Sequence, residues 1–175
     1  MKRSKSYIQT HDIDWFGIVN NKLMIHVASA GGMIPNRVNN IEQLATNRSI
    51  VMQLPILFDW NDLIINESAI LSLFEVQKSL FLEYRGVDLP QFYYDIFKDN
   101  YLKTFIPYAQ RGLLTFDKTF FKHEEQDVYH MVCRPRDVDF LKNELTSGIA
   151  NFETVDLDIM MDETAQNINI LDILK

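Results

Sequence analysis

The chain has 175 residues, 47% of them hydrophobic and 23% charged, a composition that favours one folded domain over residues 1–175 rather than a disordered chain. Its formal net charge of −7 argues against a protein that binds nucleic acid through phosphate contacts, and against one that binds a membrane surface. Because it contains one cysteine, Cys133, and no apolar run of about eighteen residues, we expect a cytoplasmic protein without an intramolecular disulfide or a membrane span.

The N-terminal segment Tyr7–Ser29 is rich in β-branched and aromatic residues and is interrupted by Asn20 and Asn21. Asparagine tolerates the positive φ angles of a tight turn, so this pattern predicts two antiparallel strands joined by a two-residue turn. In that register Trp15 lies opposite His26 on the partner strand. The sequence therefore predicts an N-terminal β-hairpin.

Two helices are predicted after the hairpin. Asn39 or Asn40 can cap the first, which has apolar residues at helical spacing and ends before Pro55. Asn66 can cap the second, although its C-terminal part, Ser79–Tyr84, is also compatible with a strand. The segment between the two helices is predicted to be a short connection.

A third helix is predicted to follow Pro90, a residue suited to a first helical turn. Pro107 is expected to kink or restart this helix, and Gly112 to end it. A short strand is predicted over Leu113–Phe116. The helix is recognised by aromatic and apolar residues at helical spacing, which are Phe92, Ile96, Phe97, Tyr101 and Phe105.

The C-terminal part of the chain is predicted to add strands and short helices. Alternation over Asp127–Arg134 and over Val155–Ile159 is typical of strands, whereas Val138–Leu145 and Ile168–Leu174 are predicted to be helical. Residues 145–175 are acidic, with six Asp and Glu against one Lys, and are expected to pack on the domain.

Together these elements predict an α+β fold with an N-terminal antiparallel β-hairpin, three to four helices, and additional C-terminal strands that complete one sheet. A mostly helical domain with an appended hairpin is the alternative.

The densest polar cluster near the N-terminus consists of His11, Asp12 and Asp14, with His26 across the predicted hairpin. Two carboxylates can bind a divalent cation or divide acid and base roles, so these four are the candidate catalytic residues, with Asp12 and Asp14 as candidate metal ligands. In the predicted register both histidines lie on the face opposite the two carboxylates, and only a β-bulge would bring all four together. The alternative is that the carboxylates are solvated and the histidines lie at a sheet edge near Trp15.

Two further patterns carry less information about chemistry. Residues 29–32, Ser-Ala-Gly-Gly, lack the ending of a phosphate-binding loop and predict a plain turn. Cys133, with His130 and His123, lacks the second close pair that a zinc site needs, which predicts an inert, packed thiol. No cofactor is predicted.

The aromatic residues of the third helix suit a core better than a ligand groove. If they line a groove instead, four charged residues that follow in the sequence could form its polar rim. These are Arg111, Asp117, Lys118 and Arg134.

Because no stretch reaches the specificity of a catalytic motif, we expect a non-enzymatic protein-interaction or regulatory protein. Its acidic C-terminal surface would dock a basic protein partner. A small metal-assisted hydrolase that uses His11, Asp12, Asp14 and His26 is the alternative. A nucleic-acid module ranks last, because it would require scattered arginines to gather on one face despite the net charge.

Overall fold

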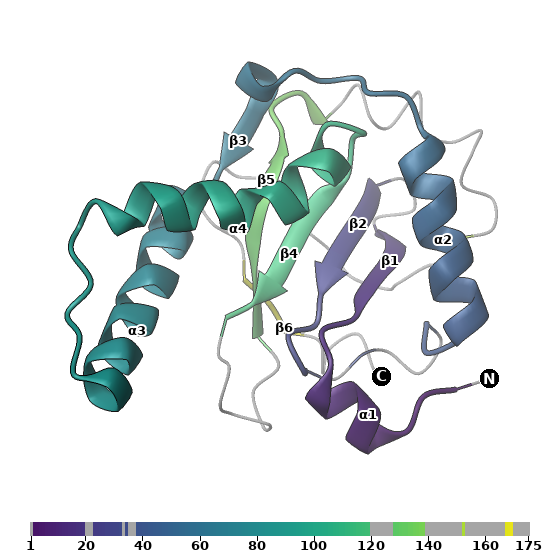
Figure 1. Cartoon of the computed structure of the whole chain (residues 1–175). Coiled ribbons are helices and arrows are strands. Elements are labelled where there is room, and N and C mark those ends of the chain that lie inside the picture. The colour runs from purple at the N-terminus through teal and green to yellow at the C-terminus, as the bar shows by residue number, and fades with distance from the viewer. Residues whose placement is uncertain are drawn as a thin grey trace.

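The structure is a computed structural model that describes residues 2–19, 23–32, 34, 38–119, 128–138, 152 and 167–169. Within them the chain forms four α-helices and a mixed six-stranded sheet, which confirms the predicted α+β class (Figure 1). The elements are α1 (Lys5–Thr10), β1 (Asp14–Val19), β2 (Leu23–Ala28), α2 (Ile41–Gln53), the 3-10 helix η1 (Trp60–Asp62), β3 (Leu63–Ile65), α3 (Glu67–Arg85), α4 (Tyr93–Ala109), β4 (Leu114–Lys118), β5 (Val128–Pro135) and β6 (Asn167–Asn169).

The strands follow the order β1-β2-β4-β5-β3, and β6 also pairs with β5. β2 and β4 run parallel, and the other pairs are antiparallel. β1 and β2 form the predicted hairpin, but Val19 pairs with Leu23, so the connection has three residues instead of two. His26 therefore lies opposite Phe16, not Trp15, and the predicted register is wrong by one residue.

The error in register has a physical cause. A shift of one residue moves every side chain of a strand to the other face, and the hydrophobic pattern normally specifies which face is buried. In β2 all six residues are buried, so the sequence of this strand contains no alternation that could distinguish the two registers.

The predicted N-caps of α2 and α3 are confirmed, whereas α4 continues through Pro107 and ends at Ala109, before Gly112. The Asn40 side chain accepts hydrogen bonds from the backbone of Glu42 and Gln43 at the start of α2, and α2 ends before Pro55 as expected. The Asn66 side chain likewise caps α3. α3 continues as a helix through Ser79–Tyr84 to Gly86, so the strand alternative for that segment is wrong.

Three other predictions are corrected. Tyr7 lies in α1, whose N-cap is the Ser4 side chain, so the first strand begins only at Asp14. The segment predicted as a connection between the first two helices contains η1 and β3, because β3 pairs with β5. Ile168 lies in β6 rather than in a helix.

Several C-terminal predictions lie outside the described residues. They are the strand over Val155–Ile159, the helix over Val138–Leu145 beyond its first residue, and most of the acidic region 145–175.

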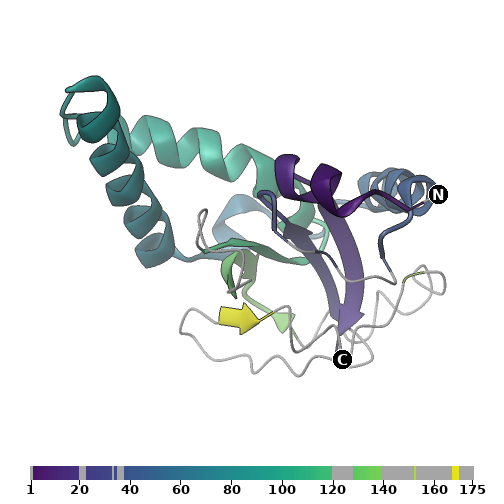
Figure 2. The same ribbon diagram turned by 90° about the horizontal axis from the view of Figure 1, so that it is seen from below.

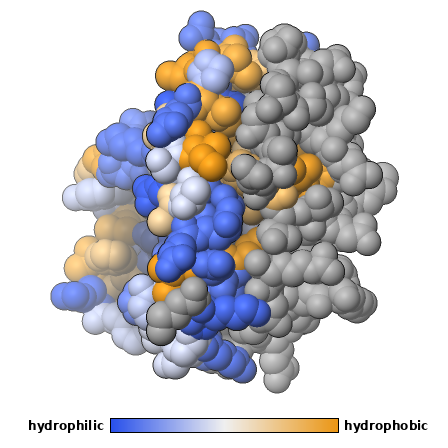
Figure 3. All heavy atoms as spheres, turned by 90° about the vertical axis from the view of Figure 1, so that its right-hand side faces the viewer, coloured by the Kyte–Doolittle hydropathy of each residue, from blue (hydrophilic) through white to orange (hydrophobic). Residues whose placement is uncertain are grey.

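Helix α4 crosses the sheet, and its residues Phe105, Ile106 and Tyr108 are buried in the core. α2 packs beside β1 at the other end of the sheet (Figure 1). On the α2 side of the molecule, hydrophilic and hydrophobic side chains are interspersed over the described part of the surface (Figure 3). None of the helices in the described ranges combines the length and apolar character needed to cross a bilayer.

The far half of α3 and the start of α4 project away from the sheet (Figures 1 and 2). We call residues 75–96 the arm. No residue of the arm is buried, although α3 is well anchored at its base by the buried side chains Ile70, Leu73 and Phe74. The arm is therefore a helical projection without a core of its own.

Candidate functional site

The structure brings together two of the four candidate catalytic residues. Nε2 of His26 donates a hydrogen bond of 2.9 Å to Oδ1 of Asp14, because the observed register places both side chains on the same face of the hairpin. The prediction that His26 lies on the face opposite Asp14 is therefore wrong. Oδ1 of Asp12 instead accepts from the backbone N–H of Ala30 at 2.7 Å, and His11 stacks on Tyr7 at the surface.

The Asp14–His26 pair lies beneath α4. The His26 side chain is 0% exposed, and its ring packs 4.1 Å from the ring of Tyr108, centroid to centroid. Burial favours the neutral form of Asp14, but the hydrogen bond and charge of His26, with the charge of Arg48, lower the pKa of Asp14 below its ordinary value. Nδ1 of His26 is buried and has no hydrogen-bond partner among the described residues.

The predicted metal ligands Asp12 and Asp14 have different partners. Asp14 is paired with His26 and lies 3.9 Å from Arg48, whereas Asp12 is bonded to the turn at Ala30. In the part of the chain that the structure describes, no three His, Cys, Asp or Glu side chains are grouped as a metal site requires.

A second polar cluster, which the sequence reasoning missed as a unit, joins α4 to β4 and β5. The hydroxyl of Tyr101 donates to Oδ2 of Asp117 over 2.7 Å and lies 3.3 Å from Nε2 of His130. Oγ1 of Thr119 lies 3.2 Å from Nδ1 of His130. Since Tyr101 gives its single proton to Asp117, its oxygen accepts from Nε2 of a neutral His130, whose Nδ1 accepts from Thr119.

Burial dominates the electrostatics of this second cluster. Burial raises the pKa of Asp117 to about 7. The hydrogen bonds that Asp117 accepts from Tyr101 and from the backbone N–H of Lys118 favour the ionised carboxylate and oppose this rise. Burial lowers the pKa of His130 to about 4, so the ring is neutral near neutral pH. The cluster therefore contains a buried carboxyl group that exchanges a proton near neutral pH, which is typical of functional sites.

A cavity of about 200 Å³ adjoins this cluster. It opens between α3, α4 and the sheet, and it connects the buried Asp117 with the exposed Asp12. Its other walls are formed mainly by apolar and aromatic side chains. The lining residues are Asp12, Ala30, Leu73, Gln77, Phe97, Tyr101, Thr104, Phe105 and Asp117.

The prediction that the aromatic residues of α4 form core is only partly right. Phe105 is buried, but Phe92 and Tyr93 are exposed on the arm. Of the four residues considered for a polar rim, Asp117 lines the cavity and the other three do not.

The predicted inert thiol is consistent with the structure. Cys133 is buried, and burial raises its pKa to about 12, so the reactive thiolate is suppressed. Its sulfur lies 3.1 Å from Oγ1 of Thr115. His130 bonds to Tyr101 and Thr119 instead, and His123 lies outside the described residues.

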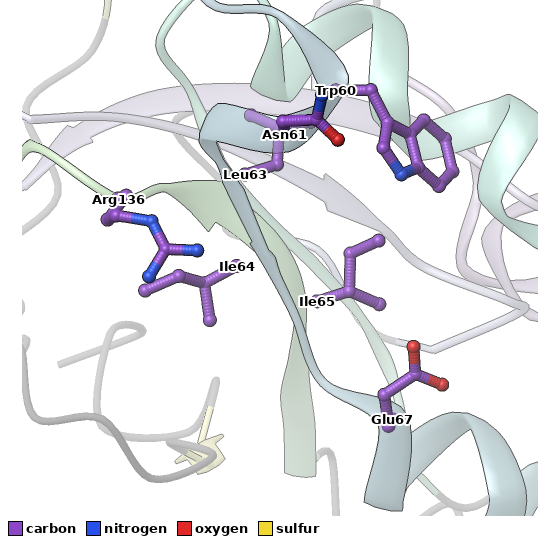
Figure 4. Close-up of a pocket in the computed structure, with 7 residues that line it drawn as sticks. All are labelled: Trp60, Asn61, Leu63, Ile64, Ile65, Glu67 and Arg136. Carbon is purple, nitrogen blue, oxygen red and sulfur yellow. The ribbon is translucent and has the colours of Figure 1, made fainter.

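A larger pocket of about 510 Å³ follows the outer edge of β3. Figure 4 shows that its side chains spread along both sides of the strand: Arg136 and Ile64 lie on one side, and Trp60 and Ile65 on the other. They do not converge on a common point, as the side chains of a specific ligand site do.

Two buried polar clusters beneath α4 and one apolar arm are thus the features that could carry function. Their interpretation depends on their own geometry, because this chain matches no family model, no curated protein and no solved structure.

Proposed function

We propose that this chain is a protein-interaction protein that binds its partner through the arm. One observation carries the proposal. Of the fourteen exposed large hydrophobic side chains in the described residues, eight lie on the arm, each between 42% and 67% exposed. They are Val76, Phe81, Leu82, Tyr84, Val87, Phe92, Tyr93 and Ile96.

The apolar residues of the arm are distributed around α3 rather than along one face. Phe81 and Leu82 are adjacent in sequence and therefore point about 100° apart around the helix. A helix that is apolar on several sides is normally buried, and helices in proteins owe most of their stability to such burial. A partner that covers the arm would supply the contacts that the chain itself does not provide.

The size of the apolar surface fits a protein partner. Eight side chains of this type and exposure present on the order of 900 Å², close to the roughly 800 Å² that each protein contributes to a standard interface.

The arm is also positioned firmly at its base. Lys98 of α4 forms an ion pair with Glu67 of α3, and the rings of Phe74 and Tyr94 meet edge to face at 5.5 Å. These contacts join the two helices where they leave the sheet, so the arm is presented in a defined direction.

The proposal is tested with Phe92→Glu, which places a charge in the apolar surface. Gln91→Glu, which adds the same charge at the neighbouring exposed position, is the control. We expect that the wild type and the control form one cross-linked complex, identified by mass spectrometry, and that Phe92→Glu does not. Equal complex formation by all three proteins would exclude the arm as the binding surface.

The metal-assisted hydrolase has weaker support. Its four candidate residues form one pair, Asp14 and His26, while Asp12 and His11 bond elsewhere. The arm proposal does not use the acidic region 145–175, which was predicted to dock a basic partner. Most of that region lies outside the described residues.

We also propose that the chain forms a single domain and that the protein is located in the cytoplasm. The supporting observation is that the one cysteine, Cys133, is a buried free thiol, which is compatible with a reducing compartment.

A further inference from the structure

The cavity of about 200 Å³ lies where the arm meets the sheet. Gln77 belongs to both the arm and the cavity lining, so a protein docked on the arm can reach the opening. We propose that this cavity binds the side chain of one lysine or arginine of the protein that docks on the arm. The inference rests on the proposed function, which it refines by naming the chemistry of the partner.

The first argument is charge. The cavity is lined by two carboxyl groups, Asp12 and Asp117, and by no lysine, arginine or histidine among the described residues. Asp14 also acts electrostatically on Asp117, although it lies outside the cavity and is itself paired with His26 and Arg48. With a net charge of −7 for the whole chain, the cavity favours a cation over an anion or a neutral group.

The second argument is hydrogen-bonding capacity. Oδ2 of Asp117 accepts from Tyr101, and Oδ1 accepts from the backbone N–H of Lys118. A carboxylate has about four acceptor positions, so each oxygen retains capacity for a further donor. An ammonium or guanidinium group supplies such donors, and charge-assisted hydrogen bonds to a carboxylate are stronger than neutral ones.

The third argument is the aromatic wall. Phe97, Tyr101 and Phe105 line the cavity. The ring centroid of Tyr101 lies 5.8 Å from that of Phe97 and 5.0 Å from that of Phe105. Aromatic faces attract cations, and they also pack against the methylene stems of lysine and arginine. The combination of carboxylates and rings therefore suits a long cationic side chain.

The fourth argument is size. Pockets for drug-sized molecules measure roughly 300–1,000 Å³, and this cavity of about 200 Å³ is smaller. It accommodates one side chain, and the rest of the partner would contact the apolar arm outside it.

The test uses the full chain and two synthetic peptides, acetyl-Leu-Lys-Leu-amide and its norleucine analogue, which differ in the ammonium group. Binding is followed by NMR titration of the backbone amides of Ala30 and Thr104. We expect the lysine peptide to bind about tenfold more tightly than the norleucine peptide. The preference should disappear in Asp117→Asn and decrease in Asp12→Asn, and it should persist in Asp99→Asn, which removes a charge from the exposed side of α4.

Equal affinity for the two peptides, or an undiminished preference in Asp117→Asn, would overturn the inference. Binding of n-butylammonium as tight as that of the lysine peptide would also overturn it, since the site would then take free amines rather than a partner's side chain. The two proposals fail separately. If Phe92→Glu prevents complex formation but the lysine peptide shows no preference, the arm proposal stands and the cavity inference does not.

Discussion

The hydroxyl of Tyr101 donates a hydrogen bond of 2.7 Å to the carboxylate of Asp117 and so connects helix α4 to the central strand β4. The two residues are sixteen positions apart in the sequence, and both meet His130 of β5. The Tyr101 hydroxyl lies 3.3 Å from Nε2 of His130, and Asp117 is the partner of His130 in the pairing of β4 with β5. Because this carboxyl group is buried, it gives the stability of the protein a specific dependence on pH.

The first prediction concerns that dependence. The pKa of Asp117 is about 7 in the folded state and 3.8 ordinarily, so the folded state binds the proton more tightly. Asp117 therefore destabilises the fold progressively as the pH rises from about 4 to about 7, by up to roughly 4 kcal/mol. We expect Asp117→Asn to gain stability relative to the wild type over this range in urea denaturation.

The comparison with the variant is necessary because other groups titrate nearby. His130, with its pKa lowered from 6.5 to about 4, has the opposite effect and stabilises the fold as the pH rises from 4 to 6.5. Asp12, Asp14 and Tyr101 also face Asp117, so the pH dependence that Asp117 causes is taken from the difference between the variant and the wild type. A difference between the two proteins that does not change with pH would show that Asp117 has an ordinary pKa.

The second prediction concerns the Asp14–His26 pair. Asp14→Asn should destabilise the protein by about 1–3 kcal/mol at pH 7, because it weakens a charge-assisted hydrogen bond to a buried ring. Since the pKa of Asp14 is lowered in the folded state, this loss should shrink as the pH falls below its ordinary value of 3.8. Thermal unfolding at pH 7 and pH 3 measures both effects, and an equal loss at the two pH values would contradict the assignment.

The third prediction separates the arm from its base. Phe92→Ser should change the free energy of unfolding of the isolated chain by less than about 0.5 kcal/mol, because Phe92 is exposed. Phe74→Ala should cost about 3–5 kcal/mol, because Phe74 is buried where α3 meets α4. Similar losses in the two variants would mean that the arm is covered within a single chain.

The fourth prediction compares two glycines with positive φ angles. Gly86, with φ of +63°, ends α3 and has open space around it, so Gly86→Ala should cost only about 1–2 kcal/mol of backbone strain. Gly31, with φ of +76°, would place a Cβ 2.7 Å from the backbone oxygen of Gln9 in α1. Gly31→Ala should therefore be the more destabilising change in urea denaturation. The reverse order would show that α1 shifts away from position 31 at little cost and so relieves the contact with Gln9.

The sequence by itself determined the fold class and the capped starts of α2 and α3. Capping is a local interaction between a side chain and backbone groups two or three residues away, so Asn40 and Asn66 could be recognised without the fold. The Ser4 cap of α1 was equally local, but it was missed because the segment that follows it, Tyr7–Ser29, has β-branched and aromatic residues that favoured a strand.

Only the tertiary structure decided the strand register, the place of β3 and the partners of the buried polar groups. β2 is buried on both faces, so its pattern could not specify which residue lies opposite His26. Asp117, Tyr101 and His130 meet because α4 crosses β4 and β5, and no local pattern encodes a crossing between distant elements. The exposure of the arm is also a tertiary property, since apolar residues at helical spacing look the same in sequence whether the fold covers them or not.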